Sequence, residues 1–164
     1  MDLLSGELQT LEQRWLSFLE VDCLDLLEYD FWLSPPEDLD DEEEVVLRSG
    51  DWNSGPCWDL AAALRLWLGS AASIDTIAIH GAVRIGAWYL DGDGLSSPSR
   101  FKRRWARNGR AQGASTALKP LDESYLRDIL NPDMVLKLAR RMRTNLDRSH
   151  FLSLLSPEVD FPNL

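Results

Sequence analysis

The chain contains one strongly apolar helical run that is followed closely by a β-rich stretch, and this succession limits the folds open to it. Residues 58–68 are mostly apolar and end at Gly69. Residues 76–85 and 87–90 are rich in β-branched, aromatic and small side chains, with Gly86 between them. A buried helical face, marked by apolar residues at intervals of three and four, is formed by Cys57, Leu60, Ala61, Leu64 and Leu68. These patterns predict an α+β fold, in which helices pack a small antiparallel sheet and this helix is central.

Cys57 lies where the central helix is expected to begin. Gly55 and Pro56 favour a turn followed by a helix start, so the thiol is predicted in the first helical turn. Free N–H groups and the positive end of the helix dipole stabilise a thiolate at such a position. The alternative is a small buried core side chain, which is a common role for cysteine.

The β-rich stretch supplies an imidazole and a carboxylate. If residues 85–87 form the tip of a hairpin, His80 lies partway along one strand and Asp91 at the far end of its partner. Across such a strand pair, the Asp91 carboxylate can reach the His80 ring and hold it by a hydrogen bond. We also expect a nitrogen of that ring to lie within hydrogen-bonding reach of the Cys57 thiol. A thiol, a base and an orienting carboxylate form the triad used in nucleophilic catalysis. Structural roles for the histidine and the aspartate are the alternative.

These motifs resemble papain-like cysteine hydrolases, and most closely the compact bacterial and phage members. The resemblance covers residues 52–97 and is carried by Gly55-Pro56-Cys57-Trp58-Asp59-Leu60-Ala61-Ala62-Ala63-Leu64, His80-Gly81-Ala82-Val83 and Tyr89-Leu90-Asp91-Gly92-Asp93-Gly94. It implies a papain-like core with Cys57 as nucleophile, His80 as general base and Asp91 as the residue that orients the base. The candidates for an oxyanion or supporting role are Asn53 and Trp58.

Residues 91–94 read Asp-Gly-Asp-Gly, which matches part of a calcium loop. The third acidic position and the later bidentate glutamate of such a loop are missing, so a glycine-rich turn is the better interpretation. We expect neither a metal nor a cofactor.

Charge divides the chain unevenly. Its formal net charge is −10, and residues 1–50 carry 15 acidic side chains against two arginines, so the rest is mildly basic. Residues 37–44 hold seven of these acids and form a candidate surface for a basic protein partner. Overall acidity argues against direct nucleic-acid binding, although Arg100 to Arg110 form a basic cluster. The simplest explanation of the uneven charge is contact between the two parts or exposure to solvent.

The chain is expected to form one domain of 164 residues. Its parts are an acidic helical region (1–50), a catalytic core (51–97) and a helical, mildly basic region (98–164). We predict helices from residue 1 to about 20 and from 22 to about 29, and further helices at 100–106, 121–130 and 131–146. The tail, 151–164, contains two prolines and is predicted to be extended.

Two cysteines are too few for a disulfide framework, and the sequence shows neither a leader peptide nor an apolar run of membrane-spanning length. A soluble cytoplasmic protein without membrane attachment is therefore expected. The leading hypothesis is a thiol hydrolase of the amidase, peptidase or deamidase kind, acting on a protein or peptide substrate. The alternative is a non-catalytic acidic binding or inhibitor protein, such as a phage anti-defence mimic of nucleic acid.

Overall fold

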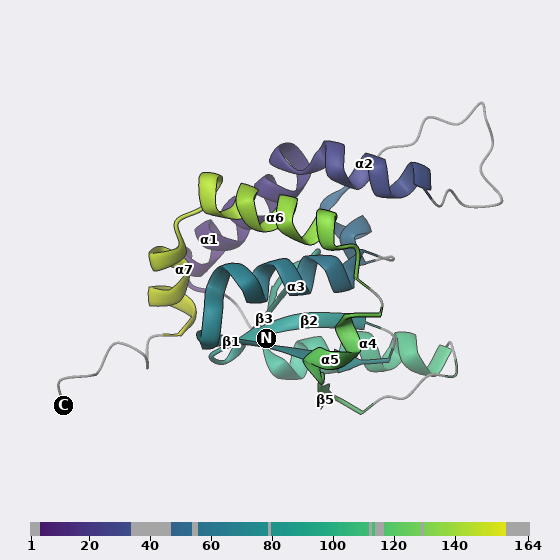
Figure 1. Ribbon diagram of the computed structural model, residues 1–164. Coiled ribbons are helices and arrows are strands. Elements are labelled where there is room, and N and C mark those ends of the chain that lie inside the picture. The colour runs from purple at the N-terminus through teal and green to yellow at the C-terminus, as the bar shows by residue number, and fades with distance from the viewer. Residues whose placement is uncertain are drawn as a thin grey trace.

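The computed structural model describes residues 4–33, 47–53, 56–78, 80–111, 113, 117–128 and 130–156. Figure 1 shows a layered arrangement, in which helix α3 (Cys57–Leu68) lies between the β-sheet and helix α6 (Pro132–Asn145). Helix α4 (Pro98–Ala111) lies on the opposite side of the sheet from α3. The predicted α+β class, with helices packed on a small antiparallel sheet, is confirmed. Across these described ranges, no helix is long and apolar enough to cross a membrane.

The sheet has five antiparallel strands in the order β4-β3-β2-β1-β5. The strands are β1 (Ala72–Ile77), β2 (His80–Ile85), β3 (Trp88–Asp91), β4 (Gly94–Ser96) and β5 (Lys119–Pro120). The hairpin at Gly86 was predicted, and its φ of 58° explains the glycine. The single strand predicted at 76–85 is wrong, because the chain reverses between Ile77 and His80, which pair with each other.

The face of the sheet under α3 is apolar. Leu60 and Leu64 of α3 belong to one buried cluster with Val83 of β2 and Leu90 of β3. Because α3 is covered by the sheet on one side and by α6 on the other, Ala63 and Leu64 are fully buried. The prediction that this helix is central is confirmed.

The face of the sheet under α4 is smaller and partly polar. Its apolar residues are Ile77, Ala82, Tyr89 and Phe101, which form a separate buried cluster. The ring of Phe101 stacks on that of Tyr89, with centroids 4.3 Å apart. Three buried polar side chains, Asp75, His80 and Asp91, belong to the same strands.

The N-terminal part is helical, as predicted, but its junction is unusual. Helix α1 (Gly6–Ser17) continues into a π-helical turn, η1 (Phe18–Asp22), and then into α2 (Leu24–Leu33). Trp15, which is fully buried, donates a hydrogen bond from Nε1 to the Asp91 carbonyl oxygen at 2.8 Å. This bond ties the N-terminal helix to the end of β3.

The C-terminal part contains α5 (Glu123–Leu126), α6 and α7 (Arg148–Leu155). Two short 3-10 turns flank α3 earlier in the chain, η2 (Ser49–Asn53) before it and η3 (Gly69–Ala71) after it. Asn131 caps α6 as predicted, accepting a hydrogen bond from the Met134 N–H at 3.3 Å. The prediction of an extended tail from residue 151 is wrong up to Leu155, because Asp147 caps α7 by accepting from the His150 N–H. Residues 157–164 lie outside the described residues.

Candidate functional site

His80 and Asp91 form the hydrogen bond that the sequence predicted. His80 Nε2 lies 3.0 Å from Asp91 Oδ2, and the two side chains are only 1% and 3% exposed. His80 opens β2 and Asp91 closes β3, so antiparallel pairing of these strands places the two residues at the same end of the sheet. The prediction that Asp91 holds the His80 ring is confirmed.

Helix α4 adds two side chains to this pair, which sequence reasoning did not include. Arg104 Nη2 donates to Asp91 Oδ2 at 3.0 Å, and Trp105 stacks on the His80 ring with centroids 3.7 Å apart. The other oxygen of Asp91 accepts from the Asp93 N–H at 2.9 Å. The carboxylate therefore has three partners, and the imidazole is covered by an indole.

One nitrogen of the buried ring has no hydrogen-bond partner among the described residues. His80 Nδ1 makes no hydrogen bond within the described part of the chain, while Nε2 is used by Asp91. A carboxylate favours the tautomer in which Nε2 carries the proton, which leaves a lone pair on Nδ1. In that tautomer Nδ1 could accept a proton, but the ring is enclosed.

Neither ring nitrogen of His80 forms the predicted hydrogen bond with the Cys57 thiol: Nε2 lies against Asp91, and Nδ1 has no hydrogen-bond partner within the described part of the chain. Successive side chains of a strand point to opposite faces, and Gly81, next to His80, faces α3: a Cβ on Gly81 would lie 2.5 Å from the Trp58 ring. His80 therefore points to the α4 face, where Trp105 stacks on it. Cys57 opens α3 on the other face and is 4% exposed. Its place in the first turn of the helix agrees with the prediction.

Asn53 and Trp58, the two supporting candidates, hold backbone segments. Asn53 Oδ1 accepts from the Gly92 N–H at 3.0 Å and so fixes the turn between β3 and β4. Trp58 packs over Gly81, where only a residue without a Cβ fits under the ring. The catalytic role of Cys57, His80 and Asp91 and the oxyanion or supporting role of Asn53 and Trp58 remain predictions. The observed contacts of Asn53 and Trp58 are structural.

A second buried polar pair lies on the α4 face. The Tyr89 hydroxyl donates to Asp75 Oδ2 at 2.5 Å. Burial, followed by the neighbouring Asp75, raises the pKa of Tyr89 above its usual value. At the edge of the site, burial and the charge of Asp91 also raise the pKa of Asp93. On this face of the sheet, the buried carboxylates of Asp75 and Asp91 are therefore fixed by hydrogen bonds from specific donors.

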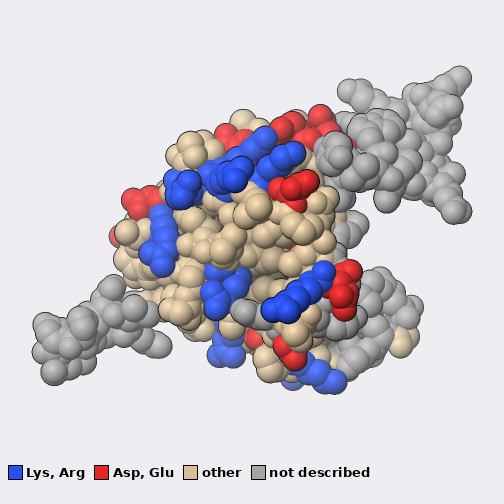
Figure 2. All heavy atoms as spheres, in the orientation of Figure 1, with Lys and Arg blue, Asp and Glu red and all other residues tan. Residues whose placement is uncertain are grey.

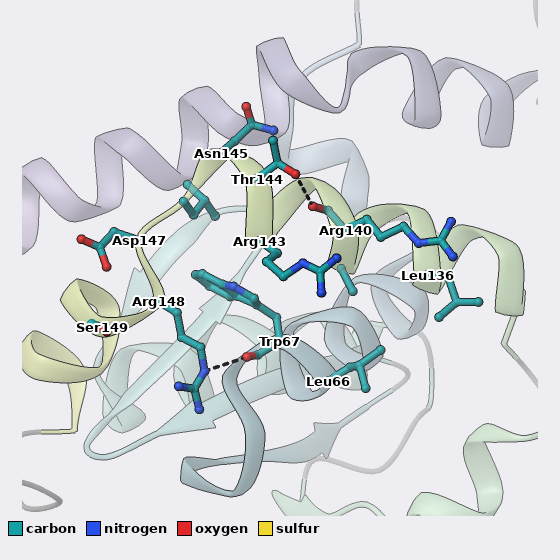
Figure 3. Close-up of a pocket in the computed structure, with 12 residues that line it drawn as sticks. Leu66, Trp67, Leu136, Arg140, Arg143, Thr144, Asn145, Asp147, Arg148 and Ser149 are labelled. Atoms are coloured by element: carbon teal, nitrogen blue, oxygen red, sulfur yellow. Dashed lines mark hydrogen bonds between the residues drawn. The ribbon is translucent and has the colours of Figure 1, made fainter.

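A hollow of the described surface lies elsewhere, between α3, α6 and the start of α7 (Figure 3). We call it the α3–α6 groove; its volume is about 990 Å³ and it is lined by Leu66, Trp67, Leu136, Ala139, Arg140, Arg143, Thr144, Asn145, Leu146, Asp147, Arg148 and Ser149. Two of the lining leucines are unusually open to solvent, Leu66 at 57% and Leu136 at 45%. Sequence analysis missed the groove because its two walls are distant in the chain.

The acidic segment 37–44, predicted to bind a basic protein partner, lies outside the described residues.

In comparisons with family models, with curated proteins and with solved structures, the chain has no match. Any functional conclusion therefore depends on the geometry of the chain itself.

Proposed function

We propose that this chain acts by binding another protein and does not act as a thiol hydrolase. The observation that carries this proposal is the enclosure of His80, whose ring is 1% exposed beneath Trp105 on the face of the sheet opposite α3. A general base must approach both its nucleophile and a substrate within hydrogen-bonding distance. A ring packed between a strand and a helix meets neither condition, whereas the α3–α6 groove offers an open surface of the size used for ligands.

The test is the reactivity of the two cysteines in the full chain. The protein is treated with iodoacetamide at pH 6.5 and pH 8.5, and alkylation of each cysteine is followed by mass spectrometry. Cys23 is an internal reference, because it is fully buried and burial raises its pKa to about 12. We expect Cys57 to react as slowly as Cys23 at pH 6.5, and a His80→Gln substitution to leave that rate unchanged.

A second candidate is the papain-like thiol hydrolase, and the His80–Asp91 bond with its unpaired Nδ1 favours it. In this candidate His80 Nδ1 takes the Cys57 thiol proton, and the thiolate attacks the carbonyl carbon of an amide. The C–N bond breaks, the amine leaves with the proton from His80, and water hydrolyses the resulting thioester, while Asp91 orients the ring. The ring would first have to leave its stack with Trp105. Rapid alkylation of Cys57 at pH 6.5, slowed by His80→Gln in a folded protein, would establish this candidate and overturn the binding proposal.

A further inference from the structure

The α3–α6 groove combines exposed leucines with arginines. Figure 3 shows Leu66 and Trp67 projecting from α3 and Leu136, Arg140 and Arg143 from α6. Positions 136, 140 and 143 are separated by four and three residues, so these side chains form one row along α6. The groove thus places apolar side chains of α3 beside a row on α6 that ends in two arginines, Arg140 and Arg143.

Arg140 and Arg143 are exposed, and neither makes a hydrogen bond or ion pair through its side chain within the described part of the chain. Arg148, at the start of α7, is different: its Nε donates to the Trp67 carbonyl oxygen and its Nη2 to that of Leu68, both at 2.9 Å. Arg148 therefore fixes one end of the groove, while the guanidinium groups of Arg140 and Arg143 are available to an incoming anion.

The charge of the groove contrasts with that of the whole chain. The chain carries a net charge of −10, yet the described residues lining the groove include three arginines and a single acid, Asp147. That acid is already used as the N-cap of α7. Figure 2 shows the corresponding concentration of Lys and Arg side chains over α6. A local positive rim on an acidic protein selects for an anionic partner surface at short range.

We infer that the α3–α6 groove receives an amphipathic, acidic helix of a partner protein; this inference rests on the proposed binding function and names the partner class. The apolar face of such a helix covers Leu66 and Leu136, and its Asp or Glu side chains pair with Arg140 and Arg143. Guanidinium groups suit carboxylates because both are planar and can form two parallel hydrogen bonds. The row from Leu136 to Arg143 extends about 10 Å along α6, so an occupant of about two helical turns matches it.

The experiment measures binding of two synthetic peptides to the full chain by fluorescence anisotropy. Both peptides carry Leu at positions i, i+3, i+4 and i+7 of a helix; one has Glu at the flanking positions and the other has Lys. We expect the Glu peptide to bind and the Lys peptide to bind at least about tenfold more weakly. The double variant R140E/R143E should reverse this order of affinity.

The matched control is R103E/R107E, which makes the same charge change on α4, at two exposed arginines on the other side of the sheet. It should leave the affinity for the Glu peptide within about twofold. Circular dichroism of both variants shows that each remains folded. If R103E/R107E weakens binding while R140E/R143E does not, the binding function stands and the groove assignment is overturned.

Two further results would overturn the assignment. Equal affinity for the Glu and Lys peptides would show that the arginines do not select the partner. A concentration-dependent dimer in sedimentation, lost in R140E/R143E, would show that the occupant is a second copy of this chain. Neither result depends on the cysteine alkylation that tests the proposed function, so the two failures are distinguishable.

Discussion

The two faces of the sheet are stabilised in different ways. On the α3 face, Leu64, Val83 and Leu90 are fully or almost fully buried in one large apolar cluster. On the α4 face, a small cluster surrounds the hydrogen-bonded pairs His80–Asp91 and Tyr89–Asp75. The apolar face depends on buried area, which is non-directional, and the polar face depends on donors and acceptors with defined positions. The first face should therefore tolerate changes that preserve volume, and the second should not tolerate loss of a partner.

The largest expected effect is on the polar face. Asp91→Ala removes the acceptor of His80, Arg104 and the Asp93 N–H, and leaves these groups without a partner. We expect the free energy of unfolding to fall by about 3–5 kcal/mol, the range for breaking a buried charge pair. Urea denaturation measures it. Asp93→Ala, at a more exposed carboxylate, is the control and should cost much less; similar losses in both variants would contradict a special role for Asp91.

A smaller effect is expected on the apolar face. Leu64→Ala leaves a cavity between α3 and the sheet and should cost about 3 kcal/mol. Leu64→Met, which nearly conserves volume, should cost less than about 1.5 kcal/mol. The comparison is sharpened by Asp91→Asn, which is also conservative in shape and should cost more than Leu64→Met in the same urea titration. The reverse order would show that the two faces do not differ as described.

The smallest effect concerns Tyr89, and it depends on pH. Tyr89→Phe leaves the buried Asp75 carboxylate without its donor and should cost about 1–3 kcal/mol at pH 7. Burial and Asp75 raise the pKa of Tyr89 in the folded state above the usual value of 10.0. The folded protein therefore keeps this proton where the unfolded chain loses it, so the contribution is complete below pH 10 and is lost as the pH rises through the folded-state pKa. Between pH 10 and 11, the parent chain should lose stability more steeply than Tyr89→Phe; parallel curves would contradict this assignment.

The sequence predicted the features that depend on local patterns. The periodicity of Leu60, Leu64 and Leu68 identified the central helix, and the glycine at position 86 identified one hairpin. Pairing of His80 with Asp91 followed from that hairpin, because the register of two antiparallel strands is fixed by their turn.

Local sequence patterns could not predict on which face of the sheet the His80 ring lies. Ala82 and Val83 are both apolar, so alternation alone did not show which side of β2 α3 covers. The turn before His80 also lacks the glycine or asparagine that usually marks a tight hairpin, and Ala78 takes a positive φ of 55° there. The groove was missed for a different reason, since Leu66 and Leu136 meet only through tertiary packing of α3 on α6.

The turn at Gly86 packs against a segment that the ribosome makes much later than the turn. A Cβ at this position would lie 2.1 Å from the Leu155 carbonyl oxygen, so the turn between β2 and β3 is packed directly against the last residue of α7. A hairpin forms within microseconds, but a ribosome adds about 5–20 residues per second. The segment that covers the turn is therefore made roughly 3–14 seconds after the turn itself. During that interval the sequence of β2 and β3 lacks the α7 segment that packs against its turn in the folded chain.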